Sequence, residues 1–364
     1  MVSVLSDRIF YKFLPADVSA WIAPPVQLWI FTSTFAFFAM MTVRAIGWLC
    51  RVLARLFAAG KEHEPSDPTR RSMLRHVASL VGGAPFVAAI YGYAWERLRF
   101  EVVRVNVPVS GLPPALEGLR IVQLSDIHVG DLMPLDQVRR AVEIANSLAA
   151  DLAVITGDFV TSAEDPLAEC IAELGRLKAP LGAWGCNGNH EIYAGAEEMA
   201  EALFTIHGMK LLRQSSAQVH WRGESLNLIG IDYQHDVPIT GGSPSLGHAE
   251  TLVRRDMPNI LLSHNPNTFP CAAAAGVELS LAGHTHGGQV NFEILKKSWS
   301  PARFMTKFIA GLYHLPTTDP GGPSRVATSK TAYLYVNRGL GTLGVPARLG
   351  ATPEITLLTL QSGS

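Results

Sequence analysis

The residues 18–43 include no charged side chain, and the inner part of this run reads VQLWIFTSTFAFFAMMTV. A helix of about 20 apolar residues crosses the hydrocarbon core of a bilayer, where every backbone polar group must be paired within the protein. Pro24 and Pro25 fit the first turn of such a helix, because the missing N–H costs little there. The sequence therefore predicts a transmembrane helix over about residues 21–43.

A second uncharged run, VASLVGGAPFVAAIYGYAW, covers residues 77–95. It is also long enough to cross a bilayer, but it contains Gly82, Gly83 and Pro85, which weaken a helix. We expect a second transmembrane span over this run. A buried or interfacial helix is the alternative.

The formal net charge of −1 hides an uneven distribution. The first 100 residues carry 11 Lys or Arg against 6 Asp or Glu, and the rest of the chain carries 19 against 25. The chain is 48% hydrophobic and 17% charged, with a mean hydropathy of +0.19, whereas a soluble domain is about 25% charged. A basic, apolar segment suits a membrane surface better than nucleic acid, which we do not expect as a main partner.

We expect a membrane anchor over residues 1–100 and a globular domain over residues 101–364.

Seven cations lie between the two apolar runs: Arg44, Arg51, Arg55, Lys61, Arg70, Arg71 and Arg75. A short loop rich in Lys and Arg favours the cytoplasmic side of a membrane. If both runs span, the globular domain is extracytoplasmic, on a bacterial inner membrane. The sequence TRRSMLR before the second run is similar to a twin-arginine export signal; simple positive-inside charge is the alternative reading.

After Phe100, short apolar runs alternate with helix-like segments. The apolar runs are residues 119–125, 152–156, 182–186, 226–231, 259–263, 277–282 and 354–360, and the helix-like segments are residues 135–149, 166–177 and 196–207. Strands that alternate with helices predict an α/β domain built from layers of sheet and helix.

Five of these strands are each followed by a polar block: SDIH, GD, NGNHE, HN and GHTHG. The carboxyl ends of strands in an open α/β sheet meet at one edge, so we expect the blocks to form one site. Alone, each block could be an ordinary polar turn or helix cap; their joint occurrence indicates a site. Seven oxygen or nitrogen ligands without a thiolate are too many for one tetrahedral zinc ion and suit two divalent ions. Mn²⁺, Fe and Zn²⁺ all accept such ligands, and we favour Mn²⁺.

The blocks SDIHVG, TGDFV, GNHE, LLSHNP and LAGHTHGGQ together resemble those of the calcineurin-like metallophosphoesterases, in particular their bacterial membrane-associated branch. The resemblance runs from about residue 118 to the C-terminus. It implies a four-layer α/β/β/α sandwich with a dinuclear site at one edge of the paired sheets. It implies that one metal is held by Asp126, His128, Asp158 and His286, and the other by Asp158, Asn189, His264 and His284. His190 matches the catalytic histidine that assists the transition state or the leaving group.

The same resemblance implies a metal-dependent phosphoric ester hydrolase, most simply a phosphodiesterase in which a hydroxide shared by the two ions attacks phosphorus. Residues 292–313 mix aromatic and basic side chains, which suggests a membrane-associated or lipid-linked substrate; ordinary packing is the alternative. Three other functions remain open. They are a pyrophosphohydrolase of UDP-diacylglucosamine-type lipid precursors, a catalytically minor membrane-tethered binding module, and a membrane protein of transport or assembly.

Overall fold

The structure is a computed structural model, and it describes residues 16–57, 68–234, 245–294, 297–304, 306–318 and 327–363. Lys61 and part of the segment 292–313 lie outside the described residues. The chain divides into two units, one of Met1–Glu96 with Gly344–Leu349 and one of Arg97–Leu343 with Gly350–Ser364. We call them the helical unit and the globular unit and describe each by itself.

The helical unit contains α2 (Ala16–Phe57) and α3 (Pro68–Ala94), which carry the two uncharged runs. Two stretches are long and apolar enough to cross a membrane: Ile22–Leu53 within α2, and Arg75–Leu98, which begins in α3 and ends four residues after it. The two helices pack together, with the Trp29 and Phe86 rings 5.4 Å apart. The helix α3 continues through Gly82, Gly83 and Pro85, so these residues do not interrupt the second predicted span.

The globular unit contains two six-stranded sheets. In order across the first sheet, the strands are β1 (Glu101–Ser110), β14 (Glu354–Gly363), β2 (Arg120–Leu124), β3 (Leu152–Thr156), β4 (Ala183–Cys186) and β5 (Lys210–Leu211). The strands β2 to β5 are parallel, and β14 is antiparallel to β2. The carboxyl ends of β2, β3 and β4 therefore lie at one edge.

In order across the second sheet, the strands are β12 (Gly311–Thr318), β13 (Ala327–Val336), β9 (Leu279–Ala282), β8 (Asn259–Leu262), β7 (Glu224–Gly230) and β6 (Ser215–Trp221). The four inner strands are parallel, and the two outer strands run antiparallel to their neighbours. A separate hairpin pairs β10 (Phe292–Ile294) with β11 (Lys297–Trp299).

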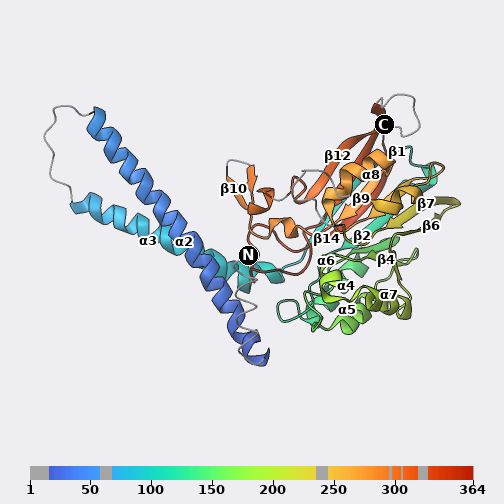
Figure 1. Ribbon diagram of the computed structural model, residues 1–364, viewed down its shortest axis with the longest axis horizontal. Helices are drawn as coiled ribbons and strands as arrows, with labels where there is room; N and C mark the ends of the chain where they lie inside the picture. Colours follow the sequence, from blue (N-terminus) through green and yellow to red (C-terminus); the bar gives the residue numbers. More distant parts are fainter. Residues whose placement is uncertain are drawn as a thin grey trace. The chain divides into compact units, whose positions relative to one another are not determined.

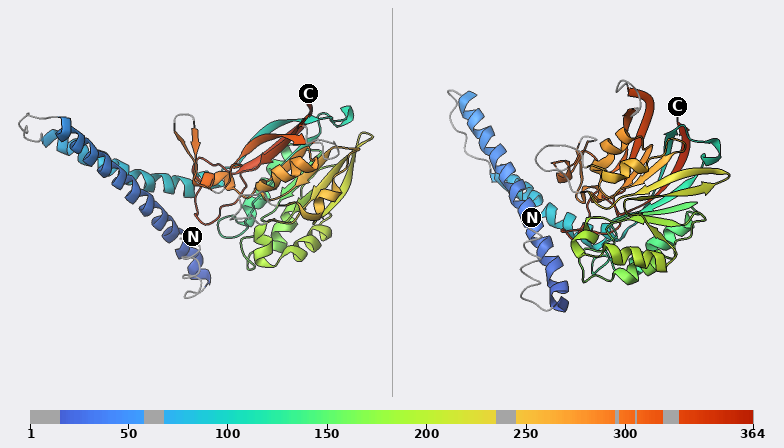
Figure 2. Two further views of the ribbon diagram at one scale, coloured as in Figure 1. Left: turned by 45° about the horizontal axis from the view of Figure 1, so that its top comes forward. Right: turned by 45° about the vertical axis from the view of Figure 1, so that its right-hand side comes forward.

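Helices cover the outer faces of both sheets. The α-helices of this unit are α4 (Leu135–Ser147), α5 (Leu167–Leu174), α6 (Asn189–Ala194), α7 (Glu197–Ile206) and α8 (Phe269–Ala275). The 3₁₀ helices are η1 (Glu96–Leu98), η2 (Pro114–Leu116), η3 (Gly247–Leu252), η4 (Pro266–Thr268), η5 (His286–Gly288) and η6 (Pro301–Phe304). Figure 1 shows α4, α5 and α7 together, and Figure 2 (right) shows the strands between these green helices and the orange α8.

Three apolar layers hold this arrangement together. Val138 and Ile171 of the helices pack with Ile155 on the outer face of the first sheet. Residues such as Val154 and Leu228 fill the space between the two sheets. Further clusters pack α8 against the outer face of the second sheet. The predicted α/β/β/α sandwich is confirmed.

Buried polar side chains also join the two sheets. Gln123 of β2 donates from Nε2 to the carbonyl oxygen of Ala282, at the end of β9, at 3.0 Å. Tyr335 of β13 donates its hydroxyl hydrogen to Glu354 of β14. Glu354 is only 2% exposed, and it also accepts from Arg338 Nε at 2.5 Å. This buried carboxylate therefore pairs with a partly buried cation and fixes one sheet against the other.

We predict that Glu354→Ala lowers the free energy of unfolding by about 2 kcal/mol, because Arg338 loses one ion pair while it keeps that with Glu101, and the buried Tyr335 hydroxyl loses its Glu354 acceptor. Tyr335→Phe removes one hydrogen bond and keeps the ring, so the expected loss is about 1 kcal/mol. Thermal unfolding of the full chain in detergent checks this order. Equal losses of Tm in the two variants would contradict it.

Candidate metal centre

The five polar blocks meet at one edge of the paired sheets, as the sequence predicts. Three blocks follow β2, β3 and β4 of the first sheet, and two follow β8 and β9 of the second. Asp126, Asp158, His264 and His284 each lie two residues beyond the last residue of a strand. Parallel strands of the two sheets thus deliver these side chains to a common place.

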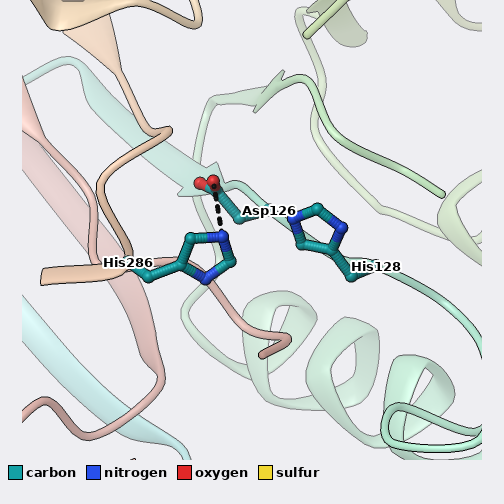
Figure 3. Close-up of side chains that lie close together, drawn as sticks. All are labelled: Asp126, His128 and His286. Atoms are coloured by element: carbon teal, nitrogen blue, oxygen red, sulfur yellow. Dashed lines mark ion pairs between the residues drawn. The ribbon is translucent and has the colours of Figure 1, made fainter. Parts of the chain in front are cut away.

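The first group of side chains is Asp126, His128 and His286, which are all buried and whose potential ligand atoms lie within 4.8 Å of one another. His286 Nε2 is 3.5 Å from Asp126 Oδ1, and the His128 and His286 rings are stacked with their centroids 5.0 Å apart. Figure 3 shows the carboxylate of Asp126 and the two imidazoles gathered around one region. These three residues can bind one cation.

The second group is Asp158, His264 and His284, and their potential ligand atoms also lie within 4.8 Å of one another. Asp158 Oδ2 is 3.0 Å from His264 Nε2 and 3.5 Å from His128 Nε2. One carboxylate oxygen therefore lies between histidines of both groups, which is the position that a bridging ligand requires.

Asn189 and His190 begin α6, beside these groups. Asn189 is 5% exposed. The backbone N–H of His190 donates to Asp158 Oδ1 at 2.9 Å, and its ring centroid is 4.8 Å from that of His128. His190 also forms a third group with His128 and Asp158, within 4.8 Å. The geometry alone thus allows His190 either to bind a cation or to act beside one.

The hydrogen bonds of the histidines test whether this site fits metal ions. His264 Nδ1 is 2.6 Å from the carbonyl oxygen of Thr156, which can only accept, so Nδ1 carries hydrogen and Nε2 presents its lone pair in the neutral ring. Within the described part of the chain, His128 Nε2, His264 Nε2 and Asn189 Oδ1 are buried without a hydrogen bond. A cation bound by both atoms would satisfy the His264 Nε2 lone pair and the Asp158 oxygen that lies 3.0 Å from it. The residues fit a site for divalent metal ions.

The electrostatics of the cluster agree with that conclusion. Burial raises the pKa of Asp126. For Asp158, the effect of burial is outweighed by His264 and His128, which hold its pKa well below the usual range. Burial lowers the pKa of His264, but Asp158 and Asp126 outweigh it and raise this pKa to about 10. The two carboxylates thus stabilise positive charge at the place where a metal ion would supply it.

The backbone of this site is unusual, because several predicted ligands adopt left-handed conformations. Among the described residues, nine that are not glycine have positive φ, and five of them are predicted ligands: Asp126 (48°), His128 (48°), Asp158 (56°), His284 (73°) and His286 (51°). Each such residue costs roughly 1–2 kcal/mol relative to a right-handed one. Such strain persists only where the surroundings impose it, typically at functional sites.

Neighbouring segments impose this conformation on Asp126. Its own N–H donates to the carbonyl oxygen of Gly157 at 3.0 Å, and its carbonyl oxygen accepts from Gly341 N at 2.7 Å. Both carboxylate oxygens accept from the backbone N–H of His284, at 2.9 and 3.1 Å. Gly283 is required here, since a Cβ at this position would collide with Asp126 Oδ2. The side chain is therefore held on several sides.

Glu191 has a structural role that the sequence analysis did not assign, although it ends the GNHE block. Its buried carboxylate accepts from the backbone N–H groups of Gly188 at 2.7 Å, Asp158 at 2.9 Å and Phe159 at 2.7 Å. Burial, and then the Asp158 charge, raise the pKa of Glu191 to about 7. Glu191 fixes the loop after β3 against the loop after β4.

Two further residues of the site had no signal in the sequence. Thr161 is paired through Oγ1 with His128 Nδ1 at 3.0 Å, and its carbonyl oxygen lies 2.8 Å from His190 Nδ1. Thr161 therefore orients both imidazoles. The ring of Tyr233, in the loop after β7, is centred 5.3 Å from that of His284. Such contacts join segments that are distant in sequence.

Two aromatic residues of the segment 292–313, Phe308 and Tyr313, serve packing. The Phe308 ring is centred 5.7 Å from that of Phe269 in α8 and 5.2 Å from that of Tyr313. Arg303 and Lys307 are exposed. The packing interpretation therefore accounts for Phe308 and Tyr313, and these rings give no support to a lipid contact.

Comparisons with known proteins point to one family. The model of the calcineurin-like phosphoesterase family matches residues 119–288. A "Transmembrane protein with metallophosphoesterase domain" from Bos taurus is 31% identical over 314 residues, which is 84% of this chain and 66% of the bovine protein. An "Uncharacterized metallophosphoesterase" from Helicobacter pylori is 30% identical over 297 residues, 80% of this chain and 72% of that protein. The metallophosphoesterase YkuE of Bacillus subtilis is 28% identical over 81% of this chain and 98% of its own length.

This chain spans slightly less than two thirds of the bovine relative and 60% of a zebrafish protein of the same name. The match to the family model begins one residue before β2 and ends with η5, so it includes every block that carries a predicted ligand. The chain belongs to the calcineurin-like metallophosphoesterases, a family of metal-dependent phosphoester hydrolases.

Proposed function

We propose that this chain is a membrane-anchored phosphodiesterase that uses two divalent metal ions, with Mn²⁺ as the favoured pair. The observation that carries the proposal is the buried carboxylate of Asp158, which faces histidine nitrogens of both groups. The proposed ligands are Asp126, His128, Asp158 and His286 for one ion, and Asp158, Asn189, His264 and His284 for the other. The family membership supports the class of reaction.

The side chains of the site have different roles in the proposed hydrolysis. When bound, two divalent cations lower the pKa of a coordinated water and offset negative charge on the phosphoryl oxygens. Asp158 spans the two positions, and its backbone N–H is fixed by Glu191. Thr161 and Thr156 orient His128 and His264 through their Nδ1 atoms. A hydrogen bond at the ring nitrogen that does not bind the metal orients a metal-binding imidazole.

His190 is the proposed proton donor to the leaving oxygen. Its Nδ1 pairs with the carbonyl oxygen of Thr161, so Nε2 is the nitrogen available to the substrate. Burial lowers the pKa of His190, although Asp158 raises it. A phosphoester anion beside the ring would favour the protonated form, which is the form that can donate.

We further propose that residues 1–100 anchor the protein in a bacterial inner membrane and that the globular unit is extracytoplasmic. Two apolar helices and the basic segment between them support this topology. A pyrophosphohydrolase of UDP-diacylglucosamine-type precursors would need a cytoplasmic site, so the side of the membrane separates these functions.

The full chain, purified in detergent, chelated and reloaded with Mn²⁺, is expected to hydrolyse bis(p-nitrophenyl) phosphate. Chelation should abolish turnover, and metal addition should restore it. Asp158→Asn should lose both turnover and bound metal, because Asp158 is the proposed ligand that the two ions share. Release of nitrophenol and metal analysis by mass spectrometry measure the two effects. An Asp158→Asn protein with full activity and two ions would refute the assignment.

His190→Gln should lower kcat by about 10²- to 10⁴-fold, the usual contribution of a positioned acid or base. The variant should retain both metal ions, because His190 is proposed not to bind them. Metal content and kcat are measured on the same preparation. Loss of an ion from His190→Gln would instead identify His190 as a metal ligand. The geometry allows that role, because His190 lies within ligand distance of His128 and Asp158.

Labelling of a single introduced cysteine tests the topology. Lys178 is exposed on the globular unit, whereas Cys170 and Cys186 are buried. In a Cys50→Ser background, Lys178→Cys should react with a membrane-impermeant maleimide in intact spheroplasts. The Cys50→Ser parent is the control for the remaining thiols. Labelling only after lysis would place the site in the cytoplasm and favour the lipid-precursor pyrophosphohydrolase.

A further inference from the structure

An exposed tyrosine lies at the outer end of the candidate metal centre. Tyr193 is 63% exposed, and its ring is centred 5.6 Å from that of His190. The His190 ring is 4.8 Å from that of His128, which stacks on His286 at 5.0 Å. These four rings form a continuous series from solvent to the buried metal ligands.

The short helix α6 fixes the position of Tyr193 relative to the site. Tyr193 is three residues after His190, so the two side chains share one face of the helix. The helix is held at its start by the bond from His190 N to Asp158 Oδ1 and by the buried Glu191 carboxylate, and it ends at Gly195 with φ of 62°. The exposed ring is therefore carried on a rigid support.

The reaction proposed above brings the leaving group toward this ring. Hydrolysis forms a bond from phosphorus to the oxygen of water and breaks the bond to the leaving oxygen. The leaving oxygen takes a proton from His190. The attacking water releases one proton, which replaces the one that His190 gives up. If His190 gives its proton there, the leaving group lies beside the His190 ring, and the exposed Tyr193 ring is a direct neighbour of that ring.

We propose that Tyr193 is a specificity-determining residue whose ring packs against the leaving group and favours phosphoesters of flat or apolar alcohols. This inference rests on the proposed function. An aromatic ring suits that role because it offers a large contact area, loses little rotamer freedom on binding and keeps a hydroxyl toward water. Tyr193 takes no part in metal binding or proton transfer.

Steady-state kinetics of the full chain with bis(p-nitrophenyl) phosphate tests the proposal. Tyr193→Ala should raise KM by about 3- to 10-fold, the range expected for loss of one aromatic contact, and should leave kcat within about 2-fold. Tyr193→Phe keeps the ring and should match the wild type. Met199→Ala is the matched control, because Met199 lies on α7 and is similarly exposed at 60%.

Inorganic phosphate, which has no leaving group, separates this role from a structural one. Its inhibition constant should be the same in Tyr193→Ala and in the wild type. An unchanged KM in Tyr193→Ala, or an inhibition constant for phosphate that rises in parallel with KM, would overturn the proposal while the hydrolase function stands. A metal-loaded wild type with no turnover would overturn the proposed function and this inference together.

Discussion

The site depends on one buried carboxylate, that of Asp158. Its Oδ2 faces His264 and His128, and its Oδ1 accepts from the backbone N–H of His190. An isolated charge at such depth would be too costly to keep, so the ionisation of Asp158 depends on the surrounding histidine and backbone nitrogens. The glycine at 188 follows from the same constraint, because a Cβ there would collide with Asp158 Oδ1.

The two sheets are needed together, because the proposed ligands come from both. The first sheet delivers the blocks after β2, β3 and β4, and the second delivers those after β8 and β9. Two hydrogen bonds, from Gln123 to Ala282 and from Tyr335 to Glu354, fix the position of one sheet against the other. Gln123 and Ala282 belong to β2 and β9, two of the strands that the blocks follow. Left-handed residues then turn the chain sharply at the strand ends, so that the side chains converge within a few residues of regular structure. The apolar core and the polar contacts between the sheets thus both hold the polar blocks at their common edge.

The strands next to the site were predictable because they are short, buried and apolar. The strand β3, for example, was expected at residues 152–156 and is found at Leu152–Thr156. The convergence of the polar blocks follows from the rule for strand ends, although the roles of the individual ligands stay predictions. The strands β12 and β13 were missed, since they mix polar and apolar residues and no ligand block follows them. The contacts of Thr161, the ring of Tyr233 and the left-handed backbone depend on segments far apart in sequence, which no local pattern reports.

The position of β14 has a consequence for how the protein is made. This strand comes after all the others in the chain, yet it lies between β1 and β2, paired with β1 from Glu101↔Glu354 onward. During synthesis, β1 and β2 therefore emerge long before the strand that joins them. Their open edges are exposed to pairing with other chains throughout translation of the residues between. An open edge is a template for pairing with another chain, and this exposure ends when β14 pairs with both β1 and β2.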